Sequence, residues 1–243
     1  MSGYSEAAPA RGGRRRRPLR AVLIVVIVLI ALLVAADFAA KAVAQGQFAS
    51  QIKSHGFPTK PDVSIKGFPF LTQLAGRDFR QVNVSSANVP EGPVTIKTMN
   101  FVLNGIHLNS GFSGATVDHL TGTVFITFPE LSSALTSQAG DLGSLVGGAG
   151  LTLTAASSNE VKASIDLVIV SGSATWRITQ TGGNEIDAKL VASSGLPPAL
   201  LGSVSNIKLQ LPALPLKLSI QSLSVTPDGI TGTLTGSHLS LSS

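Results

Sequence analysis

The stretch "VKASIDLVIV", residues 161–170, places an apolar side chain at every second position. Successive side chains of a β-strand point to opposite faces, so this period of two puts one apolar set on one face. "EIDAKLVA", residues 185–192, repeats the pattern. The apolar positions of the two stretches are Val161, Ala163, Ile165, Leu167 and Ile169, then Ile186, Ala188 and Leu190. Both stretches therefore predict β-strands with one apolar face.

Turn residues recur at regular intervals around these stretches. The strings "SSN" (157–159), "SGS" (171–173) and "TGGN" (181–184) predict a four-stranded antiparallel meander over residues 150–193. Two further hairpin turns are expected at "VPEGPV" and "TPDGI", the second joining "LKLSIQSLSVT" to "ITGTLTGSHLSLS". Three short helices, each opened by a proline, are expected at Pro69–Ala75, Pro129–Ser137 and Pro197–Leu201. The predicted fold is mainly β (α+β), a curved antiparallel sheet with a few short helices.

The N-terminus predicts a membrane segment. "RRRRPLR" runs directly into 16 apolar residues, Ala21 to Ala36. A helix needs roughly 20 residues to cross a bilayer, so the run is short for a span unless Leu19 and residues 38–40 extend it. "AVA" at 42–44 resembles a signal-peptidase site. Two interpretations stay open, an uncleaved single-pass anchor and a signal segment that is removed.

The distribution of charge sets the orientation and argues against nucleic acid as a partner. The chain carries 18 basic and 13 acidic residues, but the excess lies in the first 44 residues, and the remainder holds 11 of each. A neutral folded part lacks the electrostatic footprint of a nucleic-acid-binding protein. Arginines before an apolar run stay in the cytoplasm, so the rest is expected in the cell envelope, on the extracytoplasmic side of the plasma membrane.

Three segments follow from this pattern. Residues 1–20 are a basic cytoplasmic tail, residues 21–44 the anchor or signal segment, and residues 45–243 an exported β-rich domain. At the border between the second and third segments, Val43, Phe48 and Ile52 have roughly helical spacing and predict a short amphipathic helix on the membrane surface.

No catalytic, metal or cofactor motif stands out in the sequence. The four histidines, His55, His107, His119 and His238, are scattered and match no metal-ligand spacing. Cysteine is absent, and no pattern singles out a pair of acidic residues. We therefore predict a protein that is not an enzyme and that needs no cofactor.

The stretch "GFPFLTQLAGRDF", residues 67–79, is the strongest candidate for a site. It groups Phe68, Phe70, Leu71 and Leu74 within the region 53–80, which has a local charge of +3. Either these side chains fill one end of the sheet, or they contact lipid at the border between acyl chains and head groups. In the second hypothesis the head group lies near three cations, Lys66, Arg77 and Arg80, and anionic phospholipid is preferred.

The order of three stretches resembles a known family. "GFPFLTQLAGRDFRQVNV" (67–84), "VFITFPELSSAL" (124–135) and "LPLKLSIQSLSVTPDGITGTLTGSHLSL" (214–241) are similar to successive signatures of the LmeA-like phospholipid-binding proteins of the actinobacterial envelope. The resemblance implies a lipid-binding β-rich domain related to the tubular lipid-binding folds. It also implies a link to lipoglycan biosynthesis, with enzymes of envelope biosynthesis as partners, and brings no catalytic residue.

Lipid binding requires a surface that shields acyl chains from water, at about 0.8 kcal/mol per CH₂ group. We expect the apolar positions Ile165, Leu167 and Ile169, with Ile186 and Leu190, to form the wall of a cavity. If these side chains pack solidly against one another, a scaffolding protein of the envelope is the alternative. A lipid or glycan hydrolase or transferase would instead need clustered carboxylates or a histidine in a cleft.

Overall fold

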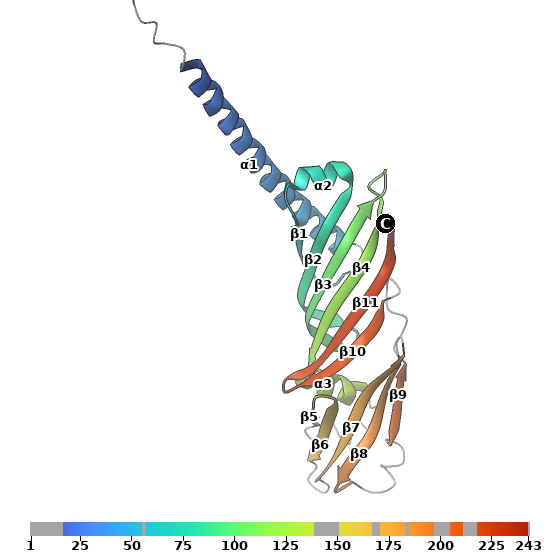
Figure 1. Cartoon of the computed structure of the whole chain (residues 1–243). Coiled ribbons are helices and arrows are strands. Elements are labelled where there is room, and N and C mark those ends of the chain that lie inside the picture. The colour runs from blue at the N-terminus through green and yellow to red at the C-terminus, as the bar shows by residue number, and fades with distance from the viewer. Residues whose placement is uncertain are drawn as a thin grey trace, which may run out of the picture.

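The computed structural model describes residues 17–54, 57–138, 151–166, 171–182, 185–196, 205–210 and 218–242. They form a long N-terminal helix and two antiparallel sheets, arranged along one elongated axis (Figure 1). The mainly β fold class with a few short helices is confirmed.

Helix α1 (Arg17–Ser54) is continuous over 38 residues. Its apolar first half is exposed, while Ala40, Ala44 and Ala49 in its C-terminal half are buried or packed against the first sheet. The separate amphipathic helix expected around Val43, Phe48 and Ile52 is therefore wrong, because these residues belong to α1. Val43 is exposed and Ala49 is buried instead, so a different stripe of the helix contacts the domain.

The first sheet has six strands in the order β1-β2-β3-β4-β11-β10. Its strands are β1 (Asp62–Lys66), β2 (Asp78–Glu91), β3 (Val94–Leu108), β4 (Gly114–Thr127), β10 (Ser219–Thr226) and β11 (Gly229–Ser242). Both predicted hairpin turns are confirmed, since one joins β2 to β3 and the other joins β10 to β11.

The second sheet has five strands in the order β5-β6-β7-β8-β9. Its strands are β5 (Thr152–Ser157), β6 (Glu160–Asp166), β7 (Ser171–Gly182), β8 (Glu185–Ser194) and β9 (Asn206–Gln210). The first four form the predicted antiparallel meander. In sequence this whole sheet lies between β4 and β10, which belong to the first sheet.

Two short helices accompany the sheets at positions expected from the sequence. Helix α2 (Phe70–Gly76) precedes β2, and α3 (Phe128–Gln138) follows β4. The third expected helix, residues 197–201, lies outside the described residues. The "SGS" turn is wrong, because Ser171–Ser173 pair with β6 as the start of β7. Serine and glycine are common in turns, but they also occur in strands, so their presence at 171–173 was not enough to predict a turn.

Strand register gives the first sheet one apolar and one polar face. Directly opposed residues share a face, and one row across the six strands is Val63, Val84, Phe101, Gly122, Leu234 and Ile220. The neighbouring row on the opposite face is Ser64, Asn83, Val102, Thr121, Thr235 and Ser219. Gly122 leaves room for the Phe101 ring, because a Cβ at this position would clash with Phe101 Cδ1.

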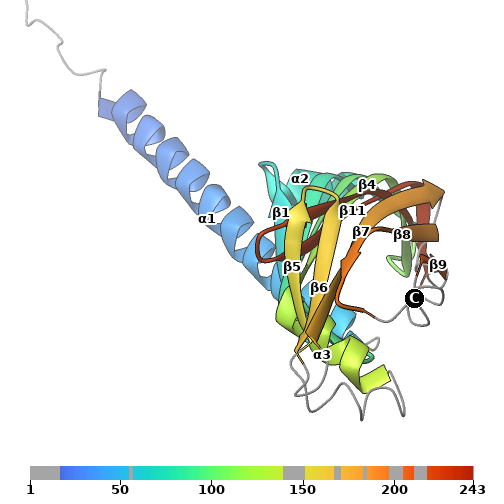
Figure 2. The same ribbon diagram turned by 90° about the horizontal axis from the view of Figure 1, so that it is seen from below.

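Two hydrophobic clusters close the ends of the apolar face. The first cluster lies beside α1 and α2 and contains Ile65, Phe70, Phe79, Ile106, Val117, Leu120, Leu218 and Leu239. The second lies at α3 and contains Phe128, Leu153, Val161 and Val225, so side chains of both sheets meet in it. Seen from below, the sheets curve around this end with α3 beside them (Figure 2).

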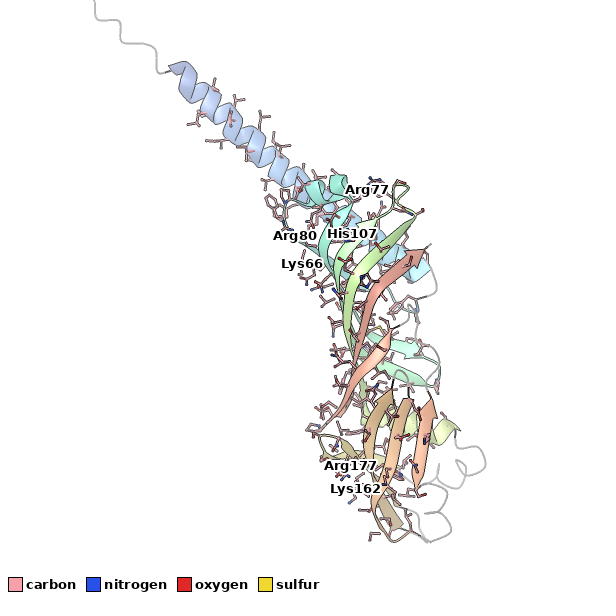
Figure 3. All side chains as sticks on the ribbon, turned by 45° about the vertical axis from the view of Figure 1, so that its right-hand side comes forward. Lys66, Arg77, Arg80, His107, Lys162 and Arg177 are labelled. Carbon is pink, nitrogen blue, oxygen red and sulfur yellow. The ribbon has the colours of Figure 1, made fainter. Side chains whose placement is uncertain are left out.

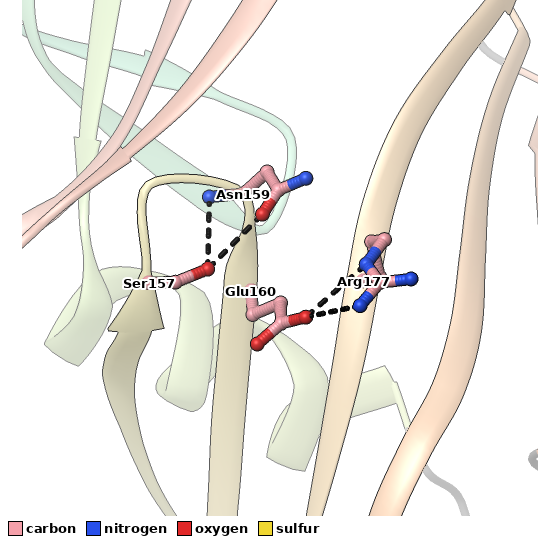
Figure 4. Close-up of polar contacts among 4 residues, drawn as sticks. All are labelled: Ser157, Asn159, Glu160 and Arg177. Atoms are coloured by element: carbon pink, nitrogen blue, oxygen red, sulfur yellow. Dashed lines mark hydrogen bonds and ion pairs between the residues drawn. The ribbon is translucent and has the colours of Figure 1, made fainter.

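The second sheet also keeps its polar side chains on one face. The predicted "SSN" turn is confirmed, and in it the Ser157 hydroxyl donates to Asn159 Oδ1 at 3.0 Å. Glu160 Oε1 accepts from Arg177 Nε and Nη2 at 3.1 and 2.8 Å across β6 and β7 (Figure 4). The opposite face carries Val161 and Ala163, which pack into the second cluster as their alternation predicted.

Candidate functional site

An acidic side chain of α1 fixes the position of α2. Pro69 is the N-cap residue of α2 and provides no side-chain hydrogen bond. The carboxylate of Asp37 caps α2 instead, because it accepts hydrogen bonds from the backbone N–H groups of Phe70 at 2.8 Å and Leu71 at 2.7 Å. Asp37 is only 3% exposed. The carboxylate satisfies two N–H groups that have no partner within the helix, and its charge suits the positive end of a helix.

A second polar contact joins α1 to the sheet. Gln45 Oε1 accepts a hydrogen bond from the backbone N–H of Ile65 on β1 at 3.1 Å. Because β1 is an edge strand, this bond covers a backbone donor that would otherwise lie open. Ala40 and Ala44 pack against the first cluster between these two contacts. Residues 37–45 of α1 are thus part of the folded domain.

A hollow of about 540 Å³ opens at the outer surface of α2. It is lined by Leu71, Leu74, Ala75, Arg77 and Phe112. Arg77 ends α2 in the left-handed conformation at φ 56°, and its backbone N–H donates to the Leu74 carbonyl at 3.1 Å. Phe112, at φ 55°, comes from the loop between β3 and β4. The hollow is therefore lined by four apolar residues and one basic residue, Arg77.

The two phenylalanines of "GFPF" have different environments. Phe70 is 1% exposed, and its ring lies in the first cluster at a tilt to the ring of Phe79, with ring centroids 6.0 Å apart. Of the two hypotheses for this stretch, the position of Phe70 matches the one in which its side chain fills one end of the sheet, because docking of α2 onto the sheet turns this ring inward. Phe68 is 58% exposed and lies 6.0 Å from the ring of Phe38 on α1. Leu71 is also exposed. The stretch thus both fills the core and presents an apolar surface.

The three candidate head-group cations lie at the same end of the molecule but not in one pocket (Figure 3). Arg77 borders the hollow, whereas Lys66 and Arg80 lie on β1 and β2. The Gln73 side chain joins these strands, donating to the Lys66 carbonyl at 3.3 Å and accepting from the Arg80 N–H at 3.2 Å. Among the residues that the structure describes, none of the three cations forms an ion pair.

Acidic groups also lie near this end. His107 contacts Asp78 through Nδ1 at 3.5 Å and Asp118 through Nε2 at 3.4 Å, and all three side chains are about half exposed. His119 and His238 form an edge-on pair on neighbouring strands, 6.3 Å between ring centroids. Within the described ranges, no group of three or more histidine or acidic side chains is arranged so that it could hold a metal ion. These histidines lie on strands and do not line the hollow, although His107 pairs with Asp78, the residue after Arg77.

Between the two hydrophobic clusters, the apolar face of the first sheet is only half-buried. We call this part the middle face, and it consists of Val63, Val84, Met99, Val124, Leu223 and Leu234. None of its members belongs to either cluster. Of the expected cavity residues, Ile165 is half-buried on β6, while Leu167 and Ile169 lie outside the described residues. Ile186 and Leu190 are half-buried on β8.

Three parts of this arrangement have only weak signals in the sequence. Asp37 directly follows the apolar run, and a charge at such a place in a membrane protein is a sign of a specific partner. Phe112 lies between "NSG" and "SG", which are turn residues, so the sequence indicates a loop there but not its contact with α2. The middle face has no clear periodic signal, because glycines at 122, 232 and 236 interrupt the alternation of β4 and β11.

One long apolar helix is present in the part of the chain that is described, and nearly all of its apolar window is exposed. This fits a signal or anchor segment. The family model for LmeA-like phospholipid-binding proteins matches residues 35–235. No curated protein and no solved structure matches the chain. The family match begins just before Asp37, so it includes the part of α1 that contacts the domain.

Proposed function

Because the chain belongs to the LmeA-like phospholipid-binding family, we propose that it holds the acyl chains of a phospholipid against the middle face of the first sheet. The single observation that carries this proposal is that the middle face, which lies between the two buried hydrophobic clusters, is apolar and only half-buried. A monomeric protein rarely leaves contiguous apolar surface uncovered unless something binds there.

The dimensions of the sheet agree with this role. Leu120 at one end belongs to the first cluster and Phe128 at the other end to the second, so the two clusters are eight residues apart, or about 26 Å at roughly 3.3 Å per residue. One leaflet of a bilayer contains about 15 Å of hydrocarbon, half of its apolar thickness. The face between the clusters can therefore accommodate acyl chains. Transfer from bilayer to an apolar surface costs little, so head-group contacts at Arg77, Lys66 and Arg80 would set a preference for anionic phospholipid.

The proposed location is the extracytoplasmic side of the plasma membrane, with α1 retained as a single-pass anchor. Cleavage after Ala44 would remove Asp37 and Ala40, which contact α2 and the first cluster. The arginines before the apolar run favour a cytoplasmic N-terminus. The intact mass of the purified full-length protein tests retention, because a loss of 44 residues would show a cleaved signal.

We further propose that the bound lipid is presented to enzymes of envelope lipoglycan biosynthesis and that the chain itself does no chemistry. The support is the family resemblance together with the exposed surroundings of the histidines and acidic groups near α2. A hydrolase or transferase would be expected to bury such groups in a cleft.

A matched pair of substitutions tests lipid binding at the middle face. Val84 and Val102 lie on adjacent strands, are both half-buried and point to opposite faces. Val84→Asp places a carboxylate on the apolar face and should greatly reduce the phospholipid that copurifies with the full chain. Val102→Asp places it on the polar face and should leave the lipid content unchanged.

Native mass spectrometry with lipid extraction measures both variants against the unchanged chain. Circular dichroism of the same samples establishes that each variant is folded. Equal lipid content in folded Val84→Asp and Val102→Asp would contradict the proposal, and complete absence of lipid from the unchanged chain would favour a scaffolding role.

A further inference from the structure

The apolar run of α1 is too short to cross a bilayer by itself. Its 16 residues, Ala21 to Ala36, span about 24 Å at 1.5 Å per residue, against roughly 30 Å of hydrocarbon. With Arg20 at the cytoplasmic boundary, the outer boundary lies about four residues farther on, near Ala40. The hydrocarbon border would then reach the point where α1 meets α2.

The charge in this extension does not face lipid. Asp37 is buried and directs both carboxylate oxygens at α2. Its neighbour Phe38 is 59% exposed and stacks with Phe68. The acidic side chain of Asp37 therefore faces the domain, and the exposed side chain of Phe38 extends the apolar surface of the helix.

Apolar side chains from three segments are exposed around this point. We name them the α2 tip, consisting of Phe38 of α1, Phe68 and Leu71 at α2, and Phe112 of the β3–β4 loop. Leu71 and Phe112 share the hollow with Arg77. Exposed aromatic and aliphatic side chains next to cations match the head-group region, where apolar bodies and charged ends are both accommodated.

We propose that the α2 tip is a docking surface that inserts into the outer head-group region of the same bilayer that α1 crosses. The occupant is the membrane surface, and the argument is its continuity with the apolar face of α1. Asp37 acts as the positioning residue, because it fixes α2 at the depth where the span ends. The proposal rests on the proposed anchor and orientation of α1, and it gives the protein a fixed contact with the leaflet that supplies lipid.

Depth-dependent fluorescence quenching in proteoliposomes of the full chain tests the docking surface. The background is Trp176→Phe, which removes the one native tryptophan. Separate probes are Phe68→Trp and Phe112→Trp at the α2 tip. Val191→Trp, an exposed apolar position on the distant strand β8, is the matched control. The vesicles contain phosphatidylglycerol and phosphatidylcholine, the latter brominated at either shallow or deep positions of the acyl chain.

Quenching of both α2-tip probes well above Val191→Trp, stronger with shallow than with deep bromines, is the expected result. Quenching of both probes no greater than that of Val191→Trp would overturn the proposal. A fourth probe, Val84→Trp on the middle face, separates the two proposals. Quenching at Val84→Trp alone would support acyl-chain binding and contradict docking, whereas quenching at the tip alone would support docking and contradict the lipid site.

Discussion

Replacing Asp37 with alanine removes the contact that joins the membrane helix to α2. The carboxylate accepts two short hydrogen bonds, from the N–H of Phe70 in a buried position and from the N–H of Leu71 in a partly buried one. Neither donor has an acceptor within α2, because both lie in its first turn. Asp37→Ala therefore leaves two donors without a partner.

The expected cost follows from these environments. A buried donor left unsatisfied costs about 1 to 3 kcal/mol, and a partly buried one costs less because water can reach it. We expect Asp37→Ala to destabilise the docked state of α2 by about 2 to 4 kcal/mol. Asp37→Asn should cost about half as much, because its amide keeps one acceptor oxygen but turns its NH₂ group toward the second donor.

Hydrogen exchange of the full chain in nanodiscs measures this effect directly. A change of about 2 kcal/mol corresponds to roughly 30-fold faster exchange when local opening controls the rate. The peptide containing Phe70 and Leu71 should show it in Asp37→Ala, and to a smaller extent in Asp37→Asn. Asp62→Ala, at an exposed aspartate of β1, is the control and should change nothing at α2. Unchanged exchange of these two amides in Asp37→Ala would refute the capping role.

Three further outcomes are expected. Phe70→Ala should lower the free energy of unfolding by about 3 to 5 kcal/mol, whereas Leu71→Ala should cost well under that, and denaturant titration would contradict this assignment if the two were equal. Lys66→Glu combined with Arg77→Glu should weaken binding to vesicles of anionic phospholipid more than to zwitterionic ones, and equal weakening in flotation assays would remove these cations from head-group selection. A reporter active only in the cytoplasm, fused after Ser243, should give no signal, and activity there would reverse the proposed topology.

Features set by neighbouring residues were predictable from the sequence. The alternation beginning at Val161 gave the meander of the second sheet, and proline at the start of a segment marked α2 and α3. Local turn chemistry located both long hairpins. In each case the physical cause, side-chain period or backbone restriction, acts within a few residues.

Features that depend on distant partners were not predictable in the same way. Asp37 and the α2 amides are 33 and 34 residues apart, so nothing local indicated the cap. Which phenylalanine of "GFPF" turns inward depends on how α2 docks, and the choice of Phe70 over Phe68 follows from that contact. The apolar row through Gly122 appears only when six strands are placed in register, because glycine itself carries no hydrophobic signal.

The strand order of the first sheet also determines when the molecule can finish folding. Strand β11, the last in the chain, lies inside the sheet between β4 and β10, and all of the second sheet is synthesised between β4 and its partner. Such distant pairing is slow, because a long loop must close before its contacts form. Until the final strand emerges, β4 is an open edge with apolar side chains beside it, which is a condition that favours aggregation. Removing residues 229–243 would therefore remove β11, which is an interior strand and not a peripheral one.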